Sequence, residues 1–287
     1  MNKEIIVNEN SELLLYLRSV LTNKSKNNIK TFINKQMVKV NENIVTDIKY
    51  NLKKGDKILI CTNFIYDKNI VIKIIYEDKD ILVVEKPENL LTIATKKEKE
   101  KTLYNIVRNY VASKNKYNKI FIIHRLDKGT SGVIMFAKNM NAKNIFQNNW
   151  DKLIKNKEYY AVCSSNIKEE GIIKTYLTQN KEGIVYSTSN KKEGKIAITK
   201  YKKITSNKKY ALVKVNILTG RKNQIRVHLS EINSPIVGDD KYGVKNSKTK
   251  RLFLHAYKLE IFNPILNKKQ VFISDLPKNF EKMSVEK

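Results

Sequence analysis

The segment between residues 122 and 137 carries the side chains of this sequence that are best suited to chemistry. It begins Ile-Ile-His-Arg-Leu-Asp-Lys-Gly-Thr-Ser-Gly and continues as an apolar run to Ala137. Two apolar runs flank a loop of ionisable and hydroxyl side chains, so a rigid sheet would hold Arg125 and Asp127 at its edge. A carboxylate held there could act as a nucleophile or a general base, or Asp127 could simply close a turn.

The elements expected around this loop are short strands with helices inserted between them. Strands are predicted at 72–76, 81–85, 120–123, 133–137, 159–163, 211–218 and 252–255. Helices are predicted at 103–111 and 142–154, where apolar side chains recur with the period of one helix face. Because strands mostly follow strands, we expect an α+β domain around a mixed, mostly antiparallel sheet. The polar stretches 97–101 and 179–194 are expected to be loops.

The first 60 residues have the pattern of a separate small α/β domain. Two short amphipathic helices are predicted around 13–21 and 29–33, followed by strands at 37–41 and 55–60. We therefore predict a small domain at residues 9–62 and a larger catalytic domain at residues 71–287.

The amino-acid composition limits the kind of binding partner and the cellular compartment that we expect for this protein. The 56 Lys and Arg against 28 Asp and Glu give a formal charge of +28, which indicates a polyanionic partner, although part of this charge could be solvated surface. No apolar stretch approaches the roughly 20 residues of a membrane span, so we expect no membrane partner. The two cysteines and three histidines have no zinc-site spacing, which predicts no metal. With so few cysteines and no secretory signal pattern, we expect a cytoplasmic protein.

The loop around Asp127 resembles the signature H-R-L-D-x-x-T-S-G of the RluA-type pseudouridine synthases. Further segments resemble motifs of this family in the same chain order, at 83–90, 157–161, 218–229, 235–243 and 254–256. The family's usual glycine in the first of them is Asn89, a residue that tolerates a positive φ. The resemblance extends from about residue 71 to residue 276 and favours a catalytic Asp127 over a turn residue.

The resemblance implies a role for each matched side chain. Asp127 would be the catalytic carboxylate, kept ionised by Arg226, and Tyr159 would stack on the uracil with its phenol near C5. Arg125 would fill the space that the flipped base leaves, and His124 and Arg221 are assigned to RNA binding. The carboxylate could attack C1′, attack uracil C6, or remove the C2′ proton, and the sequence leaves all three routes open. The isomerisation requires no cofactor. We regard His228 and His255 as hydrogen-bonded interior imidazoles.

The N-terminal segment has a weaker resemblance of its own, to the RNA-binding fold of the ribosomal protein S-four type. Ser25-Lys26, Ile33 and the two strand segments keep the expected order, and Lys26 is a candidate RNA contact. Gln36 and Glu42 stand where glycines are usual. The alternative is a generic capping domain.

These features together predict a monomeric enzyme that isomerises specific uridines of RNA to pseudouridine. We expect large-subunit ribosomal RNA as substrate, because an appended RNA-binding module suits a large structured RNA. A tRNA substrate is one alternative. A non-catalytic RNA-binding ribosome-assembly factor is another, and it would have lost Asp127, Tyr159 or Arg226. A nucleoside glycosidase would need a second paired carboxylate, which the matched segments lack.

Overall fold

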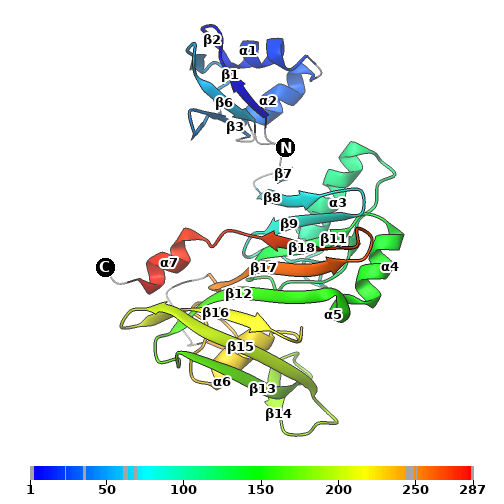
Figure 1. Ribbon diagram of the computed structural model, residues 1–287, viewed down its shortest axis with the longest axis vertical. Coiled ribbons are helices and arrows are strands. Elements are labelled where there is room, and N and C mark those ends of the chain that lie inside the picture. The colour runs from blue at the N-terminus through cyan, green and yellow to red at the C-terminus, as the bar shows by residue number, and fades with distance from the viewer. Residues whose placement is uncertain are drawn as a thin grey trace. The chain divides into compact units, whose positions relative to one another are not determined.

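The computed structural model describes residues 3–22, 24–34, 37–60, 64–67, 70–243, 249 and 251–285. The chain divides into two compact units, residues 1–73 and 74–287, and each is described by itself (Figure 1).

The N-terminal unit packs two helices against a small sheet. Its helices are α1 (Leu13–Val20) and α2 (Lys26–Asn34). The strands of the sheet, in spatial order, are β1 (Lys3–Ile6), β6 (Lys57–Ile60), β3 (Val38–Val40) and β4 (Asn43–Ile44). Further short strands are β2 (Ser11–Glu12), β5 (Asn51–Leu52) and β7 (Phe64–Asp67). The predicted apolar helix faces are buried here, since Leu13, Leu17 and Ile29 have no exposed surface.

The turn between β3 and β4 has a backbone that favours glycine at one of the two positions where the S-four-type resemblance expects a glycine. Asn41 and Glu42 have φ angles of 48° and 68°, and this left-handed conformation costs least for glycine. The other substituted position, Gln36, lies outside the described residues.

The larger unit is built on one long, mostly antiparallel sheet, as the sequence predicted. Figure 1 shows its strands, which lie in the order β14, β13, β15, β16, β12, β17, β11, β9 and β8. Their bounds are β8 Ile70–Glu77, β9 Ile81–Lys86, β11 Ser131–Ala137, β12 Ile154–Ser164, β13 Glu170–Gln179, β14 Val185–Thr188, β15 Lys195–Ser206, β16 Tyr210–Ile217 and β17 Leu254–Asn263. Two further strands pair beside this path, β10 (Phe121–Ile122) with β11 and β18 (Lys268–Ile273) with β17. The pairing of β11 with β17 is parallel, which makes the sheet mixed.

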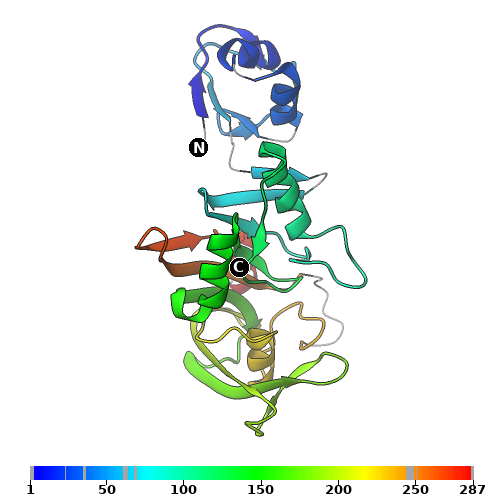
Figure 2. The same cartoon turned by 90° about the vertical axis from the view of Figure 1, so that its right-hand side faces the viewer.

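Helices cover different parts of this sheet. Their bounds are α3 Leu103–Lys114, α4 Met140–Asn148, α5 Trp150–Leu153, α6 Gln224–Glu231 and α7 Lys278–Ser284. Helix α4 contacts β11, and α6 contacts β14 and β15. Figure 2 shows β13 and β15 curving around α6. One cluster of buried side chains lies along β12, β16 and α6, and two of the matched motifs fall on β12 and α6.

Some expectations about secondary structure were wrong. Residues 179–194, expected to be a loop, contain strand β14, because Val185 on this otherwise polar segment is buried against β13 and α6. Residues 142–154, expected to be one helix, form part of α4 and then α5, which begins at Trp150. Strands β13, β15 and β18 and helices α6 and α7 were not predicted.

Candidate active site

The loop that carries Asp127 connects β10 to β11 and lies beside β17. Strand β11 is buried along its whole length, which fixes the end of the loop. Gly132 has a φ of 112°, and a Cβ at this position would lie 2.1 Å from the carbonyl oxygen of Ala256. Only glycine therefore fits where β11 meets β17, and this close approach holds the Asp127 loop against the centre of the sheet.

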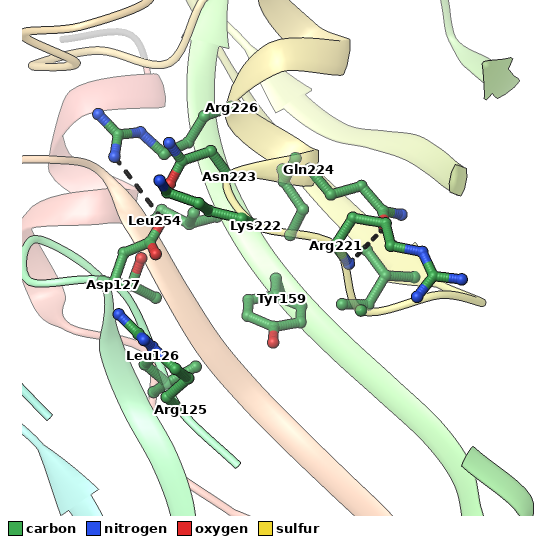
Figure 3. Close-up of a pocket in the computed structure, with 14 residues that line it drawn as sticks. Arg125, Leu126, Asp127, Tyr159, Arg221, Lys222, Asn223, Gln224, Arg226 and Leu254 are labelled. Carbon is green, nitrogen blue, oxygen red and sulfur yellow. Dashed lines mark hydrogen bonds and ion pairs between the residues drawn. The ribbon is translucent and has the colours of Figure 1, made fainter. Parts of the chain in front are cut away.

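Asp127 lies at the edge of a cavity of about 340 Å³, here named the reaction pocket. Figure 3 shows Asp127 on one side of the pocket and Arg221 on the other, with the ring of Tyr159 between them. The lining comes from four regions: the Asp127 loop, strand β12, the start of β17, and the segment 217–226 from the end of β16 into α6. Leu254, Ile217 and Leu126 supply its apolar surface. A pocket with apolar walls and a few charged groups is suited to an organic ring that carries polar edges, such as a base.

Arg226 binds Asp127, as predicted, but its closest partner is another carboxylate. Its Nη1 lies 3.7 Å from Oδ2 of Asp127, whereas its Nε and Nη2 each donate to an oxygen of Asp239 at 2.7 Å. Asp239 is fully buried and also accepts hydrogen bonds from the backbone N–H groups of Lys241 and Tyr242. This two-pronged contact fixes the plane of the guanidinium. Asp239 therefore fixes the orientation in which the Arg226 guanidinium faces Asp127.

The ionisation of Asp239 and Arg226 follows from this contact. Burial by itself favours the neutral carboxyl group, but the hydrogen bonds and charge of Arg226 lower the pKa of Asp239 below its ordinary value. Burial also works against the guanidinium charge, yet Asp239, Asp127 and Asp240 together raise the pKa of Arg226. Both groups stay charged at neutral pH, and Asp127 faces a permanent positive charge.

Tyr159 projects from β12 into the reaction pocket. Burial raises the pKa of its phenol, and the negative charge of Asp127 raises it further. The phenol therefore stays protonated at neutral pH, and the ring offers a flat apolar face with a hydroxyl at its edge.

A buried lysine lies behind the Asp127 loop. Lys86, at the end of β9, has no exposed surface, and its Nζ donates to the carbonyl oxygens of Pro87, Leu90 and Lys128 at 2.7–3.0 Å. Burial lowers the pKa of Lys86 to about 7, and the charges of Asp127 and Glu88 oppose this shift. The three carbonyl acceptors match the three N–H donors of an ammonium group. Lys86 thus ties the 86–90 turn to the loop that carries Asp127.

Three basic side chains line the solvent side of the reaction pocket, and we name them the basic rim: Arg125, Arg221 and Lys222. Arg125 and Lys222 are exposed. The Nε of Arg221 donates to the carbonyl oxygen of Ile196 at 3.0 Å, which directs its side chain along the start of β15. Nζ of Lys222 donates to Gln179 and to the carbonyl of Gly183.

The structure does not bring His124 into the reaction pocket. The ring of His124 stacks on Trp150 at 4.5 Å, and its Nε2 accepts from the backbone N–H of Met135 at 3.1 Å. Burial, with the charge of Lys157, lowers the pKa of His124 to about 3, so this imidazole is neutral. Packing accounts for these contacts, and an RNA contact stays a prediction. Lys26 is an exposed residue at the start of α2, in the other unit.

Sequence reasoning missed the two buried supports of this site. Asp239 and Lys86 both lie in segments that matched the family, but neither was given a role. Spacing alone carried no signal, since Asp239 is 13 residues from Arg226 and Lys86 is 41 residues from Asp127 in the chain. The other two histidines are buried as expected: His228 contacts Thr175 and Thr199, and His255 contacts Ser131. Asn89 has a φ of 59°, as its place in the motif predicted.

Among the described residues, no group of three or more His, Cys, Asp or Glu side chains is placed to ligate a metal ion. Within the same residues, every helix is too short or too polar to cross a membrane.

Comparison with known sequences relates the larger unit to one enzyme family. Residues 80–231 match the family model of the RNA pseudouridylate synthases. An uncharacterized RNA pseudouridine synthase of Mycoplasma genitalium is 31% identical over 294 residues, which cover 97% of this chain and 93% of that protein. Ribosomal large subunit pseudouridine synthase D of Borreliella burgdorferi is 34% identical over 220 residues, 74% of this chain and 67% of that protein.

Comparison with solved structures supports the same fold. Human RNA pseudouridylate synthase domain containing 4 superposes with a TM-score of 0.59 at 23% sequence identity, and the match covers 72% of this chain and 89% of that one. The long mixed sheet is therefore the fold of a pseudouridylate synthase domain.

Proposed function

The chain belongs to the RNA pseudouridylate synthase family, and from this premise we propose that it isomerises uridines of large-subunit ribosomal RNA with Asp127 as its catalytic carboxylate. The observation that carries this proposal is the placement of Asp127 in the reaction pocket, beside both Tyr159 and Arg226.

The reaction breaks the bond between ribose C1′ and uracil N1, turns the base, and joins C1′ to C5, where a proton is lost. Positive charge develops on the sugar as the base departs, as it does in glycoside hydrolysis. An ionised carboxylate near C1′ stabilises that charge and is placed to form a transient bond or to accept a proton. Asp127 is only partly exposed, with 27% of its side chain accessible, so its charge acts in a poorly solvated site.

The aromatic ring beside Asp127 suits the base while it turns. Tyr159 offers its face to the uracil, and its protonated phenol is available to donate a hydrogen bond to the base. A phenol with a raised pKa is a weak base, so we assign Tyr159 chiefly to stacking and orientation, and its part in removing the C5 proton is secondary.

The two arginines serve different steps in this proposal. Arg226, fixed by Asp239, stabilises the ionised form of Asp127 and stays in place during the reaction. Arg125 is exposed at the edge of the pocket and has the reach to occupy the space of an extruded base. Extrusion costs a few kcal/mol, and a guanidinium that stacks and hydrogen-bonds in the vacated space offsets part of this cost.

One observation and one further proposal favour ribosomal RNA over tRNA. The Borreliella relative, whose printed name specifies the large ribosomal subunit, is similar over three quarters of this chain. We further propose that the N-terminal unit binds RNA through its exposed basic side chains, which include Lys24 and Lys26 near the start of α2. Such a unit increases affinity for a large structured substrate.

The test is to map pseudouridines in total cellular RNA with and without the gene, and with the gene restored as wild type or as Asp127→Asn. We expect one or more large-subunit sites to be lost on deletion and regained only with the wild type. Sites lost from tRNA alone would instead support the tRNA alternative. An unchanged map would contradict the assigned reaction.

A further inference from the structure

A second cavity lies next to the reaction pocket, and the mechanism described above does not use it. This cavity of about 400 Å³, here named the side pocket, shares Gly220, Arg221 and Lys222 with the reaction pocket. These three residues therefore form a common wall, with Asp127 and Tyr159 on one side and the ends of β13 and β15 on the other.

Both pockets lie on the same face of the sheet. Tyr159 pairs with Val215, and Val215 pairs with Tyr201, so all three side chains project to one face. Along β15, Lys195 is separated from Tyr201 by an even number of residues within a regular ladder, and it projects to that face too. A strand of RNA that delivers a uridine to Tyr159 would therefore continue over the side pocket without crossing the sheet.

The side pocket has an apolar floor and a basic edge. Leu177 and Val185 on its floor belong to a small cluster of buried apolar side chains beneath α6. Lys195, Lys222 and Arg221 bring three positive charges to its edge, against the single carboxylate of Glu193. An apolar surface bordered by cations matches a nucleotide, whose base is flat and largely apolar and whose phosphate is anionic.

We propose that the side pocket binds a nucleotide that flanks the target uridine in the same RNA strand. The base contacts the floor at Leu177 and Val185, with Lys195 beside it at the pocket edge. The phosphate between the two nucleotides lies near Arg221 and Lys222 on the common wall. This assignment rests on the proposed function, because it takes a uridine in the reaction pocket as its starting point. The enzyme would then recognise the nucleotide next to the target uridine as well as the uridine itself.

The test uses Lys195→Glu, with Lys200→Glu as matched control. Both lysines are exposed on β15, and the substitutions change the net charge equally, but Lys200 projects to the opposite face of the sheet. The substrate is the stem-loop that carries the mapped uridine, whether that map places it in ribosomal RNA or in tRNA. Kd and single-turnover rates are measured for this stem-loop and for versions with an abasic residue on either side of the target.

For Lys195→Glu we expect Kd to rise about tenfold and the rate at saturating RNA to stay within about threefold of wild type. For Lys200→Glu the rise in Kd should stay below about threefold. One of the two abasic substrates should weaken binding by the wild type but have less effect on binding by Lys195→Glu, because both changes disturb the same contact.

Equal Kd values for the two variants would overturn the side-pocket assignment. It would also be overturned if the effect of Lys195→Glu on the binding free energy added fully to the effect of each of the two abasic substrates. The proposed function fails in a different way, through absence of pseudouridine formation by the wild type on every RNA tested. In that case the Kd values of Lys195→Glu and Lys200→Glu are compared on purified large-subunit ribosomal RNA, since binding does not depend on turnover.

Discussion

Two groups of basic side chains surround Asp127: a buried group behind it and an exposed group around the pocket. The two groups differ in how their side chains are held. Arg226 is held by two hydrogen bonds to a fully buried Asp239, and Lys86 donates to three carbonyl oxygens. The basic rim, by contrast, has two of its three side chains exposed. The first region has one defined geometry, whereas the second can adapt to a ligand.

This difference assigns the buried region to the chemical step and the basic rim to RNA binding. A charge in a poorly solvated site acts strongly on its neighbours and is little affected by salt, whereas exposed charges near a phosphate backbone act through counterion release and depend strongly on salt. Changes in the buried region should therefore reduce the rate at saturating RNA. Changes in the basic rim should reduce affinity and its salt dependence.

Among the charged groups that surround Asp127, the largest effect is expected for Asp239→Asn. Loss of one partner from a buried ion pair costs about 3–5 kcal/mol of stability, and Arg226 would lose its orientation toward Asp127. We expect single-turnover rates to fall by about a hundredfold, a loss of about 2.7 kcal/mol, at saturating RNA. Asp240→Asn is the control, because Asp240 also contacts Arg226 but is 94% exposed. Equal, small losses for both variants would contradict the role given to Asp239.

The same variant carries a prediction about pH. The pKa of Asp239 lies below its ordinary value of 3.8, so the ionised carboxylate stabilises the fold above that pH. This contribution is lost as pH falls below 3.8 and the carboxylate is protonated. Acid unfolding of the wild type should therefore steepen in this range, and Asp239→Asn should show a shallower dependence. Chemical denaturation at several pH values measures both.

Lys86→Met comes next in expected size. It leaves the carbonyl oxygens of Pro87, Leu90 and Lys128 without their buried donor, which should cost about 1–3 kcal/mol of unfolding free energy. The rate should fall because the Asp127 loop loses its tie to the 86–90 turn. Lys128→Met, on an exposed side chain of the same loop, is the control and should change the unfolding free energy by less than about 0.5 kcal/mol. Similar stability losses in the two variants would show that the buried contacts are not responsible.

Arg125→Ala, in the basic rim, should have an effect that depends on substrate structure. Its loss should be large on a base-paired stem-loop and smaller on a flexible single strand, where extrusion of the uridine costs less. Arg226→Ala should reduce the rate on both substrates alike. Single-turnover assays on the paired and unpaired RNA distinguish the two arginines. If the ratio of the rate loss on paired RNA to that on unpaired RNA were the same for both variants, the separate roles of Arg125 and Arg226 would be contradicted.

The smallest effect is expected in the N-terminal unit. Lys26→Ala should weaken binding to long ribosomal RNA a few-fold and reduce the slope of log K against log salt by about one, with turnover on a short stem-loop unchanged. Lys53→Ala, an exposed lysine elsewhere in the unit, is the control. If both variants retain the wild-type slope, α2 is not an RNA-binding element.

The residues that line the reaction pocket could be picked out from the sequence, whereas the buried residues that support them could not. The physical reason is that the first lie in local motifs and the second depend on tertiary packing. Asp127, Arg226 and Tyr159 lie in short motifs whose letters are recognisable without any tertiary information. The link from Arg226 to Asp239 depends on how α6 packs beside the 235–243 segment, which no local pattern reveals.

The sheet was predicted from β8 to β16 and missed at the end formed by β13, β14 and β15. Strands β9 and β11 each contain a continuous buried apolar run, so their sequence shows them directly. Strands β13, β14 and β15 lie at the other end, where many lysines face solvent, and their pairing rather than their composition makes them strands. The side pocket, which lies among these strands, could not have been expected from the sequence.

The central claim is that Asp127 carries out the chemistry while the surrounding cations hold the RNA, and Asp127→Asn tests it most directly. An amide has nearly the shape of the carboxylate but is neither nucleophilic nor basic. We predict that the variant binds the target stem-loop with a Kd within about threefold of wild type and forms no measurable pseudouridine under single-turnover conditions, a loss of at least about a thousandfold. Turnover within tenfold of wild type would contradict the account.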